Sequence, residues 1–82
     1  AKSPFVRAAA LRALAKVDLL SFTTVLSGLD LDVDWRVRAA LADALTVLHP
    51  DNASPMLQRL LADKDARVVP SALRAWSTLG LP

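Results

Sequence analysis

Residues 6–14 of the sequence read VRAAALRAL, and this pattern returns as VRAALADAL at 37–45 and as VVPSALRAW at 68–76. Successive copies start 31 residues apart, and no gap is needed to align them. A fixed period of this length is the signature of a repeat architecture, in which each repeat is one small unit of secondary structure. The chain therefore divides into three repeats, the last one partial, at about 1–31, 32–62 and 63–82.

Each copy carries apolar residues at offsets 0, 4, 7, 8 and 11 from its first valine. At about 100° per residue these offsets share one stripe of an α-helix, so we expect this stripe to be buried in all three copies. The stripe residues are Val6, Ala10, Ala13, Leu14 and Val17, then Val37, Leu41, Ala44, Leu45 and Leu48, then Val68, Ala72, Ala75, Trp76 and Leu79.

A second helix is predicted between the copies, over residues 19–29 and again over 51–62. The two segments match under the same offset, so that Phe22 aligns with Ala53. Hydrophobic residues make up 54% of the chain and aromatic residues only 5%, and the alanine and leucine that dominate favour helix over strand. The sequence predicts one all-α domain over 1–82, with five helices arranged as an α-α superhelix, or solenoid.

Polar residues stand where the predicted helices should begin. A side-chain oxygen just before a helix can accept a hydrogen bond from its free backbone N–H groups. Pro70 complicates the last copy, because a helix that began at Ala66 would lack one N–H, and we expect this helix to start later or to kink. The expected caps are Ser3, Asp34 and Asp65 for the helices that carry the stripe, Asp51 or Asn52 for the helix at 51–62, and Gly80 for the end of the last helix.

The segments DVDWRVRAAL at 32–41 and DKDARV at 63–68 resemble HEAT repeats, specifically the short bacterial variety named after phycobilisome-lyase-like proteins. The pattern of that family has an aspartate before the helix, then Val-Arg, then alanines and leucines. The resemblance implies a solenoid in which the aspartate and the arginine form a ladder between successive repeats. By position the ladder residues would be Asp32, Asp63, Arg7 and Arg38.

The third copy departs from the family pattern, because Val69 stands where the arginine should be. The ladder is therefore expected to stop at its second rung. The resemblance says less about function, since the family includes scaffolds, transport factors, lyase-related subunits and DNA-repair proteins.

Residues that catalysis or a cofactor would need are scarce. The chain has no cysteine, no glutamate and one histidine, His49, which we expect at the C-terminal end of a helix. Thiolate sites and the His-Glu di-iron centres of some HEAT proteins are thereby excluded. The string DLDVD at 30–34 resembles the start of a calcium loop, but Trp35 and Leu41 occupy the positions where that loop needs Gly and Glu. We expect no metal, no cofactor and no enzyme activity.

The expected function is protein–protein interaction or scaffolding, as a module or as an accessory domain of a larger protein such as an enzyme. The alternative is nucleic-acid binding, motivated by a net charge of +2 and by arginines on the stripe-bearing helices. It is disfavoured because the polar face of the second helices has Arg59 as its one cation, whereas phosphate contacts dominate nucleic-acid affinity. Trp35 would either contact a partner or cover the junction between repeats, and we favour the junction. The candidate partner contacts are Trp35, Arg36, Gln58 and Arg59.

The ends of the array should expose apolar surface. A solenoid repeat buries its apolar face only against its neighbours, and about three repeats are the usual minimum. Two explanations stay open: the chain is a fragment of a longer protein, which we favour, or it associates with copies of itself through its ends. No apolar run approaches the ~20 residues of a membrane span, so no membrane is expected, and the compartment is left undetermined.

Overall fold

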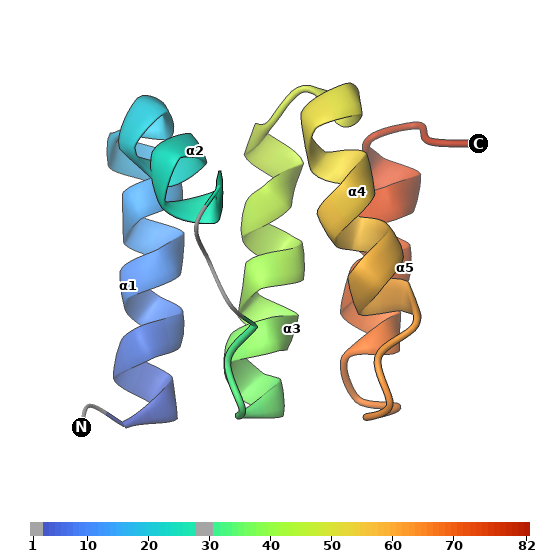
Figure 1. The fold of residues 1–82 in the computed structure, drawn as a ribbon, viewed down its shortest axis with the longest axis horizontal. Coiled ribbons are helices and arrows are strands. Elements are labelled where there is room, and N and C mark those ends of the chain that lie inside the picture. Colours follow the sequence, from blue (N-terminus) through green and yellow to red (C-terminus); the bar gives the residue numbers. More distant parts are fainter. Residues whose placement is uncertain (1–2, 28–30) are drawn as a thin grey trace.

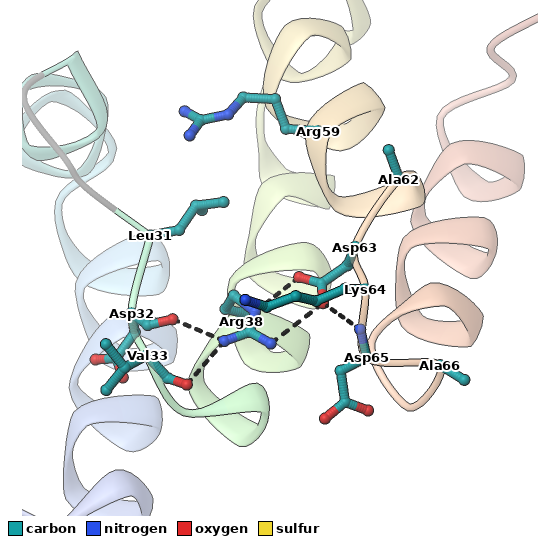
Figure 2. Close-up of a pocket in the computed structure, with 10 residues that line it drawn as sticks. All are labelled: Leu31, Asp32, Val33, Arg38, Arg59, Ala62, Asp63, Lys64, Asp65 and Ala66. Atoms are coloured by element: carbon teal, nitrogen blue, oxygen red, sulfur yellow. Dashed lines mark hydrogen bonds and ion pairs between the residues drawn. The ribbon is translucent and has the colours of Figure 1, made fainter.

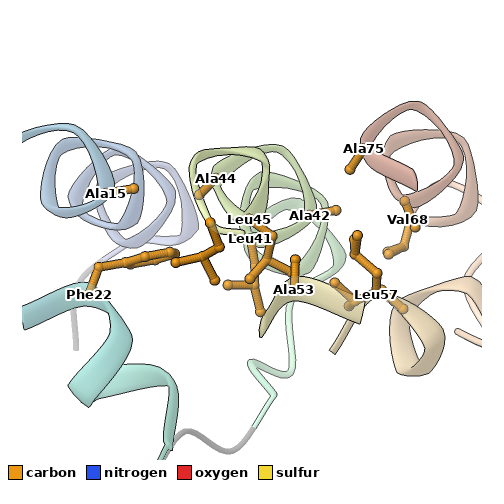
Figure 3. Packing of buried hydrophobic residues seen from close by; sticks show 13 residues of the cluster. Ala15, Phe22, Leu41, Ala42, Ala44, Leu45, Ala53, Leu57, Val68 and Ala75 are labelled. Carbon is orange, nitrogen blue, oxygen red and sulfur yellow. The ribbon is translucent and has the colours of Figure 1, made fainter. Parts of the chain in front are cut away.

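The computed structural model describes residues 3–27 and 31–82, and this part of the chain is all-α, as predicted, without a β-strand. Three helices stand side by side in one row, in the order α1, α3, α5, and α2 and α4 lie together on one side of that row (Figures 1 and 3). The elements are α1 (Pro4–Val17), α2 (Leu19–Ser27), α3 (Trp35–Ala44), the 3-10 helix η1 (Leu45–Val47), α4 (Pro50–Leu61) and α5 (Val69–Thr78).

The 31-residue period of the sequence is visible in where the helices begin. The first residues of α1 and α3 are Pro4 and Trp35, and those of α2 and α4 are Leu19 and Pro50. Both pairs are 31 residues apart. The predicted helix over 19–29 is seen as far as Ser27, and residues 28–30 lie outside the described part of the chain.

The last helix begins three residues later than the period would place it, at Val69. Pro70 is the reason: with no N–H to donate, it fits only the first turn of a helix. The expectation that Asp65 caps this helix is therefore wrong. Asp65 instead accepts from the backbone N–H of Arg67 at 2.9 Å, within the turn that precedes α5, and the N-cap position belongs to Val68.

The predicted apolar stripe is buried in α3 and α5 but not in α1. Val37 and Val68 are 4% and 0% exposed, whereas Val6, at the same position of the first copy, is 49% exposed. Ala10, Ala13 and Val17 of α1 are exposed as well, so the prediction is wrong for these four positions, whereas the fifth, Leu14, packs against the core.

The reason is the direction in which the stripe points. Figure 3 shows the stripe residue Ala44 of α3 on the side towards α1, and the stripe residue Ala75 of α5 on the side towards α3. The stripe thus faces the preceding helix of the row, and α1 has no preceding helix within the described residues. What α1 buries is its other side, where Ala8 and Ala15 are each 5% exposed and Ala15 points towards α3 (Figure 3).

The core lies between the row and the helices beside it. Phe22 of α2 and Leu57 and Leu60 of α4 are fully buried and meet Leu45 and Val68 from the row. Side chains of this size contribute about 1.5–3 kcal/mol each on burial. Three of these five side chains come from α2 and α4, which cover the core on one side of the row.

Local capping fixes most helix ends. The Ser3 Oγ accepts from the N–H of Val6 at 3.2 Å, and the Asp34 Oδ1 accepts from the N–H of Arg36 at 2.8 Å. Helix α4 was expected to be capped by Asp51 or Asn52, but it begins at Pro50, so both residues lie within its first turn.

The cap of α4 is His49, whose Nδ1 accepts from the N–H of Asp51 at 3.2 Å. The prediction that His49 sits at the last carbonyls of a helix is thus wrong: it acts as an acceptor at the start of one. An imidazole nitrogen can cap in this way because its unprotonated nitrogen carries a lone pair.

Gly80 ends α5, with φ +68°. Its N–H donates to the carbonyl of Ser77 at 3.0 Å, and the N–H of Leu81 donates to that of Trp76 at 3.1 Å. This pair of bonds is the Schellman motif, which needs a residue in the left-handed region and so favours glycine.

Candidate functional site: the arginine–aspartate ladder and the hollow beside it

The structure brings the predicted ladder residues together in two rungs. In the first, Nε and Nη2 of Arg7 on α1 donate to the two carboxylate oxygens of Asp32, at 2.7 and 2.9 Å. Asp32 lies in the connection that leads into α3. A planar guanidinium that bonds both oxygens fixes direction as well as distance, so this rung holds the start of the second repeat against α1.

The second rung has the same geometry one repeat later. Nε and Nη2 of Arg38 on α3 donate to Asp63 at 2.7 and 3.1 Å. Nη1 of Arg38 also donates to the backbone carbonyls of Asp32 and Val33, both at 2.9 Å (Figure 2). The side chains of Arg38 and Asp63 are 10% and 6% exposed, against 32% and 21% for Arg7 and Asp32.

The two rungs are linked through Asp32. Its carboxylate is held by Arg7, while its backbone carbonyl is held by Arg38. At the register position of a third arginine stands Val69, as the sequence indicated. The described chain therefore contains a continuous ladder of two rungs that ends at the partial repeat.

The rungs shift the pKa of their aspartates. The hydrogen bond from Arg7 lowers the pKa of Asp32, and that from Arg38 lowers the pKa of Asp63. The backbone N–H groups of Asp34 and Asp65 add to this effect, donating to Asp32 and Asp63 at 2.9 and 2.8 Å. Each donor favours the charged carboxylate over the neutral acid, which is why the pKa falls.

Beside the second rung lies an open hollow of about 970 Å³. Its walls are the connection before α3, at residues 31–33, and the connection before α5, at 62–66, with Arg38 between them (Figure 2). Arg59 of α4 extends over it from one side, and the side chain of Lys64 reaches across it in front of Arg38 (Figure 2).

Lys64 was missed in the reading of the sequence. It was assigned to a connector because it stands between Asp63 and Asp65, which were read as a ladder residue and a cap. In the structure, Asp63 forms an ion pair with Arg38, and Asp65 forms one with Arg67. The lysine between them reaches the hollow instead (Figure 2).

The four candidate partner contacts do not form one surface. Trp35 packs against the core and lies under the guanidinium of Arg67, whose Cζ is 4.2 Å from the ring centroid. This contact spans the junction between the second and third repeats, the role we favoured for it. Arg36 pairs with Asp34 at 3.1 Å. Of the other two, Gln58 donates to Ser54, and Arg59 borders the hollow.

The arginines that motivated a nucleic-acid function are largely engaged within the chain. Arg36 and Arg67 form ion pairs with Asp34 and Asp65, at 3.1 and 2.9 Å, and the Arg67 hydrogen bond lowers the pKa of Asp65 to about 2. Arg74 lies 3.6 Å from Asp43. Such pairs reduce the positive charge that this side could offer to phosphates.

The residues raised for a calcium loop are also accounted for in part. The carboxylates of Asp32 and Asp34 bond Arg7 and Arg36, and Asp30 lies outside the described residues. Over 3–27 and 31–82, no cluster of three or more histidine or acidic side chains is placed to hold a metal ion. Nor does any helix of this part combine the length and the apolarity that crossing a membrane requires.

Comparison with known proteins gives no match: no family model, no curated protein and no solved structure matches this chain.

Proposed function

We propose that this chain is a piece of a HEAT-like solenoid that works as a non-catalytic protein-interaction module. Its surface for a partner would be the exposed apolar stripe of α1, made of Val6, Ala10, Ala13 and Val17 and called here the α1 stripe.

The observation that carries this proposal is a difference between equivalent positions. The same stripe is buried in the second and third copies, where its alanines Ala44 and Ala75 face the preceding helix of the row. On α1 it is apolar and exposed, and Leu20 of α2 is another exposed apolar residue, at 79%. An apolar helix face of this kind marks an interaction site. Because the equivalent alanines Ala44 and Ala75 face another helix of the row, we take the partner to be a helix of the same type, from a neighbouring repeat or from a second copy.

Two features support the solenoid assignment. The ladder repeats one residue pair with the period of the sequence, and α1–α2 and α3–α4 begin in the same register. Stacked repeats that contact only their neighbours are the defining property of a solenoid.

The test is the concentration dependence of the molecular mass, by sedimentation equilibrium from micromolar to millimolar protein. We expect reversible self-association through the α1 stripe, and Ala13→Asp should reduce it strongly because it places a charge in the apolar contact. Ala9→Asp is the matched control, since Ala9 is an exposed alanine of the same helix outside the stripe. A monomer throughout, or equal effects of both variants, would contradict the proposal.

A further inference from the structure

We infer that the hollow beside the second rung binds an acidic peptide segment, with Arg59 and Lys64 as the residues that receive its carboxylates. This inference goes beyond the proposed function, because it concerns another surface and does not depend on the α1 stripe.

The first step is that the acidic residues of the hollow are already neutralised. Asp32, Asp63 and Asp65 line it, and each is bonded by an arginine of the chain: Arg7, Arg38 and Arg67 respectively. Each of them also accepts a backbone N–H. These carboxylates are therefore poor ligands for an incoming cation.

The second step is that two cations of the hollow are not neutralised. The side chains of Arg59 and Lys64 are exposed, and neither side chain forms an ion pair or a hydrogen bond with any residue of 3–27 and 31–82. Because every lining carboxylate is paired with an arginine, these two side chains give the hollow an excess of positive charge. Figure 2 shows that both extend over the same space.

The third step is the apolar part of the lining. Leu31, Val33, Ala62 and Ala66 border the hollow, and Val33 is 93% exposed, the highest value among the exposed large hydrophobic residues. Arg59 also borders a second hollow of about 460 Å³ between α2 and α4, which is lined by Met56 and Pro55. A ligand that passes Arg59 would meet further apolar side chains there, beside the polar Thr23, Asp51 and Asn52.

This combination favours a peptide over other anions. A peptide segment carries carboxylates and apolar side chains together, whereas free phosphate would leave the apolar lining unused. Two cations are also few for a nucleic acid, whose affinity grows with the number of phosphates that are contacted. The charges would mainly steer and orient the segment, since exposed ion pairs add little energy individually.

The experiment is an NMR titration of the full chain, labelled with ¹⁵N, with the capped peptide Glu-Glu-Leu-Glu-Glu. We expect chemical-shift changes at residues 31–33 and 62–66, and we expect the Arg59→Gln/Lys64→Gln variant to bind about tenfold more weakly, within what two exposed ion pairs supply. Both side chains are exposed and unpaired in the described chain, so this variant should keep the wild-type far-UV circular dichroism.

The matched control is Arg12→Gln/Lys16→Gln, which removes the same net charge from exposed positions of α1 that do not line the hollow. Binding by this variant within about twofold of wild type supports a defined site. Equal weakening by both variants would show that only net charge matters, and shifts confined to other residues would place binding elsewhere; either result overturns the inference.

Three further ligands test the chemistry of the segment. Capped Lys-Lys-Leu-Lys-Lys and inorganic phosphate should bind much more weakly than the acidic peptide. If either binds the hollow equally well, or if a short DNA duplex binds it more tightly, the assignment to an acidic peptide is wrong. None of these outcomes depends on the sedimentation result, so the two proposals can fail separately.

Discussion

The hairpins α1–α2 and α3–α4 have the same register but different surroundings. Phe22 and Ala53, 31 residues apart, are both fully buried. Val17 and Leu48 have the same separation, yet they are 85% and 7% exposed. Equivalent residues of the second helices are buried in both hairpins. Equivalent residues that face a neighbouring repeat are buried only where that repeat is present. In this fold, burial is decided by the neighbour as much as by the residue.

The two rungs show the same contrast for polar groups. Their short Nε–Oδ2 distances are equal, 2.7 Å, but the side chains of the Arg38–Asp63 rung are much less exposed than those of the Arg7–Asp32 rung. Two rungs with the same pair of donor atoms should therefore contribute different amounts to the free energy of unfolding. The experiments below test this contrast, beginning with the largest expected effect.

Replacing Arg38 by Met should cost about 3–5 kcal/mol of unfolding free energy, because it leaves the buried carboxylate of Asp63 and two backbone carbonyls without their donor. Arg7→Met, at the more exposed rung, should cost clearly less. Urea denaturation followed by circular dichroism measures both values. Equal losses would mean that the exposure of the rungs does not control their energy.

Truncating the first valine of the stripe should cost different amounts of unfolding free energy in α3 and in α1, and both losses should be smaller than that of Arg38→Met. Val37→Ala removes two buried methyl groups and should cost about 2 kcal/mol. Val6→Ala, half-exposed at the same register position, should change the stability by less than about 0.5 kcal/mol. Denaturation at low protein concentration keeps self-association out of the measurement. A large loss for Val6→Ala in the dilute monomer would show that the α1 stripe is covered.

Removing the N-caps Ser3 and Asp34, which stand at the same register position, should cost less unfolding free energy than the changes above, and the two costs should differ less. Asp34→Ala should cost about 1 kcal/mol, since a charged acceptor also interacts with the positive end of the helix dipole. Ser3→Ala should cost about 0.5 kcal/mol, because its neutral hydroxyl accepts a longer bond on a helix at the end of the row. Asp34→Asn and Ser3→Thr are the controls that keep an acceptor, and thermal melts should place both near wild type.

The last test concerns the dependence of the unfolding free energy on pH, which we expect to be weakest between pH 5 and 8. Asp32 and Asp63 have lowered pKa values in the folded chain, so the stability that they contribute is complete above the unfolded value of about 4. It should be lost as the pH falls from there through their folded pKa values. Urea midpoints at pH 7, 5, 3 and 2 test this. Arg38→Met should flatten the acid limb, and an unchanged limb would assign it to other carboxylates.

Much of the fold could be predicted from the sequence, because helix period and repeat period are local and redundant. The rungs followed from the register and the family resemblance, since Arg7 and Arg38 fall one period apart, as do Asp32 and Asp63. That the ends of the array expose apolar surface was predicted, and the α1 stripe confirms it; which residues of α1 stay exposed depends on which helix stands beside them, and the period alone does not give that. The cap by His49 was missed because the neighbouring Asp51 and Asn52 are stronger capping residues by type.

The hollow was beyond the reach of sequence reasoning for a different reason. Its residues come from two connections, 31–33 and 62–66, and from two helices, which contribute Arg38 and Arg59. The period aligns positions of successive repeats but does not say which side chains meet across a connection. Asp65 pairs with Arg67, which leaves Lys64 without a carboxylate partner among the lining residues. Both follow from the local geometry of the turn before α5, which exists because Pro70 makes the helix begin only at Val69.

The double use of Asp32 has a mechanical consequence. Its side chain is fastened to α1 and its backbone carbonyl to α3, so one residue transmits load between neighbouring helices through a planar, two-bonded contact on one side and a carbonyl bond on the other. Sliding α1 along α3 would have to break these bonds together. The ladder therefore resists sliding of one helix along the next. Apolar packing sets the distance between the helices, and the bonds of Asp32 fix their relative position along the helix axis.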